Sequence, residues 1–94
     1  MQYKSFVITV LTQLMLITLL GACSSSEEQQ ANYLNRAQEQ YDADDFKKAR
    51  LELRNVFQIN PYNPQARYLS ALIYGQEPNW REVSKNLRLA IEYA

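Results

Sequence analysis

The chain has 94 residues, with ten basic and ten acidic side chains, one cysteine and no histidine. This length allows one small domain, and a formal net charge of zero provides no electrostatic basis for binding nucleic acid or an anionic membrane. A single cysteine cannot build a disulfide framework, and the lack of histidine removes the commonest general base and metal ligand. The composition therefore predicts a protein that is not an enzyme and has no cofactor.

The first 22 residues have the organisation of a secretion signal. Lys4 belongs to a short n-region, residues 6–20 form an apolar run, and small residues follow. As a helix, this run would reach about 22 Å, which is shorter than the ~30 Å hydrocarbon core of a bilayer. A cleaved signal is therefore favoured, and a retained membrane anchor is the alternative.

Cys23 lies directly after this run, in the sequence Leu20-Gly21-Ala22-Cys23. The sequence resembles the lipobox of bacterial lipoproteins, in which cleavage precedes a cysteine that receives diacylglycerol. Small residues fit a narrow peptidase cleft, and a thiolate is the side-chain nucleophile best suited to alkylation. We therefore predict a lipoprotein signal peptide over residues 1–22 and lipidation at Cys23. The alternative is an incidental buried cysteine.

Residues 23–29 are predicted to be the lipidated cysteine and a polar tether. Three serines and then Glu27, Glu28 and Gln29 follow the cysteine, and such a segment is too hydrophilic to pack. A serine directly after the cysteine resembles the pattern of lipoproteins that are exported to the outer membrane. That resemblance implies a location in the cell envelope, at the periplasmic face of the outer membrane.

Four helices are predicted in the remainder of the chain, over residues 29–43, 46–59, 64–75 and 80–93. Asp44 or Asp45 can cap the second helix, because a carboxylate accepts hydrogen bonds from free backbone N–H groups. Pro61 ends that helix, since proline disfavours helical geometry in the residue before it. The third helix starts with Asn63 as its cap and Pro64 at its first position.

An acidic cluster at the end of the first helix requires a separate interpretation. Asp42, Asp44 and Asp45 are the kind of ligands that Ca²⁺ prefers, but the glycine and the distal glutamate of an EF-hand loop are missing. We interpret the cluster as a helix end and a cap, and we predict no metal site.

The apolar positions of the second helix recur 34 residues later in the fourth helix. The pairs are Phe46 and Trp80, Ala49 and Val83, Leu53 and Leu87, Val56 and Ala90, Phe57 and Ile91, and Ile59 and Tyr93. Their spacing fits the buried stripe of a helix, and a period of 34 residues is typical of stacked two-helix solenoid units. On this register we expect Trp80 to pack between the third and fourth helices.

The pattern resembles the tetratricopeptide repeat (TPR), with one repeat over residues 30–63 and an incomplete, uncapped second repeat over residues 64–94. The residues that match the family's small, aromatic and proline positions are Ala37, Phe46, Ala49, Pro61, Ala71, Tyr74, Trp80 and Ala90. Arg67, Val83 and Gln40 depart from that pattern. The resemblance implies an all-α fold of two helix-turn-helix repeats in a short α-solenoid. An unrelated four-helix bundle is the alternative.

A narrower resemblance covers residues 49–74, which are similar to the repeats of TPR lipoproteins tied to PEP-CTERM protein sorting and exopolysaccharide export. It implies a lipid-anchored, non-catalytic adaptor for protein–protein interactions in the bacterial envelope. Lipoproteins of pilus assembly and outer-membrane assembly share this architecture, and an adaptor of a peptidoglycan hydrolase would as well. A truncated fragment of a longer lipoprotein is a further alternative.

The TPR resemblance also implies where partners bind, because the first helix of each repeat lines the concave groove of the family. The implied groove residues are Leu34, Gln38, Tyr41, Gln65, Tyr68 and Leu72. For Leu34 and Leu72, covering the core is an equal alternative. We also predict a terminal interface of Leu87, Ile91 and Tyr93, where self-association or a partner helix would cover an apolar patch. The expected partners are unidentified proteins and, through Cys23, the membrane.

Overall fold

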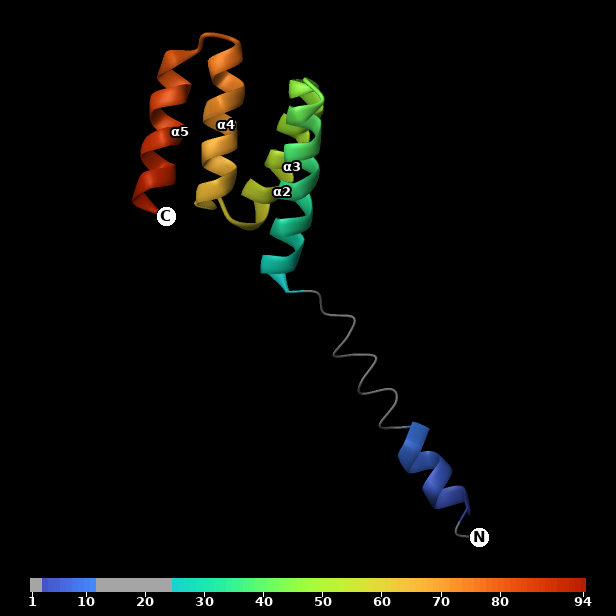
Figure 1. Ribbon diagram of the computed structural model, residues 1–94. Helices are drawn as coiled ribbons and strands as arrows, with labels where there is room; N and C mark the ends of the chain where they lie inside the picture. Colours follow the sequence, from blue (N-terminus) through green and yellow to red (C-terminus); the bar gives the residue numbers. More distant parts are fainter. Residues whose placement is uncertain (1–2, 12–24) are drawn as a thin grey trace.

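The computed structural model describes residues 3–11 and 25–94. Residues 3–11 are helical, and four longer helices follow them (Figure 1): α2 (Ser26–Asp42), α3 (Phe46–Ile59), α4 (Pro64–Gln76) and α5 (Trp80–Glu92). No strand occurs in the described ranges, so the prediction of an all-α fold is confirmed for them. Cys23 and the predicted lipobox lie outside the described residues.

None of the helices in these described ranges combines the length and the apolar character needed to cross a bilayer.

The four helices form two antiparallel hairpins, α2 with α3 and α4 with α5 (Figure 1). The hairpins meet through α4, which contacts both α2 and α3. Among the four, α5 contacts α4 alone, so α5 lies at the edge of the fold.

A side-chain cap starts each of the four helices. Ser25, Asp45, Asn63 and Asn79 each accept a hydrogen bond from the backbone N–H three residues further on. Such caps satisfy one of the backbone donors that a helix start leaves without a partner. The predicted caps Asp45 and Asn63 are therefore confirmed, while Asp44 has a positive φ of 60° and makes the turn.

The start of α2 differs from the prediction, because the helix begins at Ser26 and not at residue 29. Ser25 caps it, and Glu27 and Glu28 lie in its first turn, where carboxylates interact favourably with the positive end of the helix dipole. The expected tether is thus helical from Ser26 onward, although these polar side chains stay exposed. One turn later Gln30 is buried, and its Oε1 accepts a hydrogen bond of 3.0 Å from Asn63 Nδ2.

The core lies between α2, α3 and α4. Its buried residues are Ala37, Ala49, Leu53, Val56, Ala66, Leu69 and Ile73. The three alanines let the helix backbones approach closely, and the larger side chains fill the space between them. Burial of Leu53 or Ile73 contributes ~1.5–3 kcal/mol each to the free energy of unfolding.

The position of Trp80 contradicts the prediction that it packs between the third and fourth helices, because its side chain is 66% exposed. In the first hairpin, the rings of its counterpart Phe46 and of Tyr41 lie 5.5 Å apart. The residue 34 positions after Tyr41 is Gly75. Apart from its own helix backbone, no heavy atom lies within 4 Å of the point where a Cβ would stand. Trp80 therefore lacks the ring against which Phe46 packs.

Gly75 also does not end the third helix as predicted. Helix α4 continues to Gln76, and Gly75 has no positive φ.

Candidate binding groove

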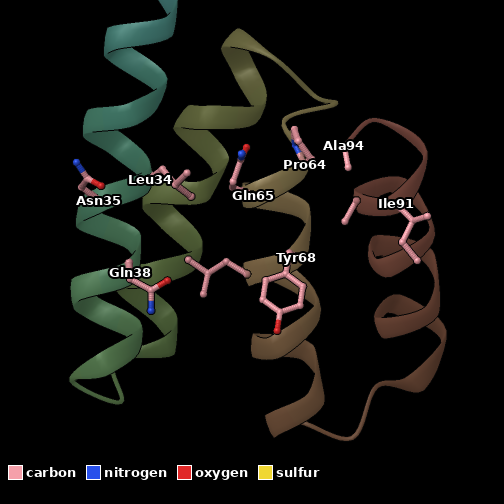
Figure 2. Close-up of a pocket in the computed structure, with 10 residues that line it drawn as sticks. Leu34, Asn35, Gln38, Pro64, Gln65, Tyr68, Ile91 and Ala94 are labelled. Atoms are coloured by element: carbon pink, nitrogen blue, oxygen red, sulfur yellow. The ribbon is translucent and has the colours of Figure 1, made fainter.

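A groove of about 680 Å³ opens between α2, α4 and the C-terminal end of α5. Figure 2 shows Tyr68 of α4 between Leu34 and Gln38 on one side and Ile91 on the other. The groove therefore draws its lining from both hairpins.

The lining of the groove carries no charged side chain. Its apolar members are Leu34, Pro64, Tyr68, Leu69, Ala90, Ile91 and Ala94, and its polar members are Asn35, Gln38 and Gln65. Each of the three amides offers both a donor and an acceptor, and the Tyr68 hydroxyl does so too. Such a surface suits a neutral ligand with apolar groups and hydrogen-bonding groups, which a peptide segment provides.

One of the three amides is held in place within α2. Gln38 Nε2 donates a hydrogen bond of 2.9 Å to Asp42 Oδ1, one turn further along the helix. The bond uses one amide proton and orients the Gln38 side chain along the exposed side of α2.

The hairpins are fixed to one another by Arg67, at the position where the sequence departs from the TPR aromatic pattern. Its Nε donates to the Pro61 carbonyl at 2.8 Å, and its guanidinium lies 4.1 Å from the centre of the Phe57 ring. Its Nη1 donates to Asn86 Oδ1 at 3.0 Å. A planar cation thus replaces the aromatic residue and joins α3 to α5.

The partner of Arg67 on α5 is the most buried residue of that helix. Asn86 is 2% exposed, and its Nδ2 also donates to the Glu82 carbonyl at 2.8 Å. Both the Oδ1 and the Nδ2 of this buried amide therefore have hydrogen-bond partners. We infer that the bond to Arg67 sets the rotation of α5 about its own axis. That rotation brings Ala90 and Ile91 to the groove.

The structure separates the six groove residues that the TPR resemblance implied. Leu34, Gln38, Gln65 and Tyr68 line the groove. Tyr41 and Leu72 pack against the core and do not line the groove, and the Tyr41 ring contacts Phe46. Leu34 both lines the groove and packs against the core.

Other lining residues were not singled out from the sequence. Asn35 lies three residues before Gln38 on α2, so helical spacing could have found it. Ala90 and Ala94 come from α5 and its end, and no local pattern indicates that they meet α2 and α4.

The residues of the predicted terminal interface also take different places. Leu87 and Ile91 are exposed on α5, and Ile91 in addition lines the groove. Tyr93 stacks on Tyr62 of the loop between α3 and α4, with ring centres 4.5 Å apart, and its side chain remains 44% exposed.

No group of three potential metal ligands occurs in residues 3–11 and 25–94.

Comparisons with protein-family models, with curated proteins and with solved structures found no match to this chain.

Proposed function

We propose that the chain is a non-catalytic adaptor that binds a segment of another protein in the groove. The observation that carries the proposal is the neutral, largely apolar lining, which three helices from two hairpins build together. A volume of about 680 Å³ lies in the range typical of ligand sites. Because the lining holds no charged side chain, recognition rests on apolar burial and on hydrogen bonds from the amides of Asn35, Gln38 and Gln65.

We further propose that the two hairpins are TPR-like repeats. The 34-residue period supports this, as do the equivalent caps Asp45 and Asn79 at the starts of α3 and α5. The contacts of α4 with both helices of the first hairpin are those expected of stacked two-helix units.

The lipobox-like sequence at Cys23 supports attachment to a membrane through acyl groups. With Ser24 after the cysteine, we place the adaptor at the periplasmic face of the outer membrane in a bacterial envelope. The resemblance over residues 49–74 favours a role in protein sorting or exopolysaccharide export. Genes that flank this one would distinguish that role from pilus assembly, outer-membrane assembly or the control of a peptidoglycan hydrolase.

A photocrosslinking experiment tests the groove. A benzophenone amino acid replaces Tyr68 in the full-length protein within cells, and the adducts are identified by mass spectrometry. The control carries the same group at Leu51, which is 50% exposed on α3 and does not line the groove.

We expect an adduct that forms from position 68 and not from position 51. A second substitution, Leu34→Glu, should abolish that adduct while circular dichroism shows unchanged helix content. Identical adducts from both positions, or an adduct that survives Leu34→Glu, would contradict binding in the groove.

A further inference from the structure

The outer side of α5 carries a row of residues that no other described helix covers. Trp80, Ser84, Leu87 and Ile91 are spaced by four, three and four residues, so they share one side of the helix. Leu87 is 36% exposed and Ile91 is 79% exposed, in addition to the exposed Trp80. We call these four residues the α5 stripe. Among the described helices, α5 contacts α4 alone (Figure 1).

The counterparts of the α5 stripe in α3 show what such a row binds. These counterparts, 34 residues earlier, are Phe46, Arg50, Leu53 and Phe57. Arg50 and Phe57 receive α4, because Arg50 forms an ion pair with Glu77 and Arg67 lies over Phe57. Phe46 packs on Tyr41 of α2 instead. Leu53 is fully buried beneath this contact. In α3, residues with the same spacing therefore pack against an antiparallel helix, α4.

Helix α2 of a second copy does not fit the α5 stripe. The buried residues that α4 brings to its neighbours include Ala66, Leu69, Ser70 and Ile73. Their counterparts in α2 are Asn32, Asn35, Arg36 and Glu39, which are all exposed and polar. Seating them on Trp80 and Ile91 would desolvate polar groups without partners.

Helix α5 of a second copy is disfavoured by charge. One flank of the α5 stripe holds the residues that follow its members, which are Arg81, Lys85, Arg88 and Glu92, so this flank carries a net charge of +2. An antiparallel pair of α5 helices centred between Ser84 and Leu87 places these two flanks, each with a net charge of +2, against one another. Like charges at such flanking positions oppose pairing.

The same two arginines are available to a partner. Among the described residues, no carboxylate lies within ion-pair distance of Arg81 or Arg88. We propose that the α5 stripe binds an amphipathic helix of another protein, with an apolar face against Trp80, Leu87 and Ile91. Aspartate or glutamate residues on one flank of that helix pair with Arg81 and Arg88.

This surface is distinct from the groove, although Ile91 borders both. Leu87, Arg81 and Arg88 do not line the groove, so changing them tests the α5 stripe alone. A failed crosslink from position 68 in the groove would therefore not affect peptide binding at the α5 stripe.

Two synthetic peptides serve as probes of the full-length protein in a non-ionic detergent. Both are helical and carry the same row of leucines, and the flanking positions hold glutamate in one and lysine in the other. Trp80 is the only tryptophan, so its emission reports directly on the α5 stripe. We expect the glutamate peptide to cause a saturable blue shift and to bind about tenfold more tightly than the lysine peptide at low salt.

Three variants complete the experiment. Leu87→Glu should abolish the blue shift, whereas the matched exposed site Leu51→Glu on α3 should leave it unchanged. Arg81→Glu combined with Arg88→Glu should reverse the preference, so that the lysine peptide binds more tightly. Peptide partition into detergent does not depend on α5. Comparison of the wild type with the three variants in one detergent therefore corrects for it.

Two results would overturn the proposal. One concerns the charge of the peptides: the two peptides bind equally, or the double arginine substitution does not reverse the preference for the glutamate peptide. The other is a dimer of the full-length protein in sedimentation that Leu87→Glu dissociates, because a second copy would then be the occupant.

Discussion

The substitution Asn86→Ala tests whether the hydrogen bonds of this buried amide hold α5 in place. The bond from Arg67 Nη1 involves a charged donor and contributes ~1.5–3 kcal/mol. The bond from Asn86 Nδ2 to the Glu82 carbonyl adds ~0.5–1 kcal/mol, and the better helix propensity of alanine offsets a similar amount. We therefore expect the free energy of unfolding to fall by about 2 kcal/mol, which lowers the Tm by about 10 °C in a domain of this size.

The measurement is urea denaturation followed by circular dichroism, with the full-length protein in a mild detergent. Asn32→Ala is the matched control, because Asn32 is exposed on α2 and its loss should change stability by less than about 0.5 kcal/mol. If Asn86→Ala costs no more than this control, then the contact between Arg67 and Asn86 does not stabilise the packing of α5 on α4.

Three further sites give predictions of other kinds. Gly75→Ala should raise the free energy of unfolding by roughly 0.5–1 kcal/mol, because Gly75 is helical and has open space around it. A lower free energy of unfolding in urea denaturation would mean that the space is filled. Gly75→Tyr should shift Trp80 emission to shorter wavelength by restoring the ring that Phe46 has in Tyr41, and emission like that of Gly75→Ala would refute this explanation. Asp45→Ala should cost about 1 kcal/mol through loss of the α3 cap, again by denaturation, and no loss would contradict the cap. Mass spectrometry of membranes should show a chain that begins at Cys23 with two or more acyl groups, since one gives only marginal binding. Cys23→Ser should remove them, and an unmodified 94-residue chain in the wild type would contradict the lipobox.

The local features of the fold could be predicted from the sequence because their causes are local. Asn63 and Pro64 start α4, Asp45 caps α3, and the helix bounds follow from such residues within a few positions. The environment of Trp80 could not be predicted in the same way. Phe46 is its counterpart by period, but the packing of either ring depends on the residue five positions before it, which is Tyr41 in one case and Gly75 in the other.

The groove was also only partly accessible from the sequence. The TPR resemblance implied Leu34, Gln38, Gln65 and Tyr68, which line the groove. The contribution of Ile91 depends on the rotation of α5, which the buried contact of Asn86 with Arg67 sets across 19 residues of sequence. A pattern of apolar spacing within one helix does not contain that information.

The unequal ends of the four-helix fold have a consequence for crowded surfaces. Proteins that join head to tail through two different surfaces form open filaments when the rotation between neighbours does not close a ring. Here an apolar end formed by α5 is combined with an opposite end, the outer side of α2, whose residues Asn32, Arg36 and Glu39 are exposed and polar. The polar side of α2 does not match the apolar side of α5, so copies of this chain cannot join head to tail. A protein bound at α5 would therefore not start a filament.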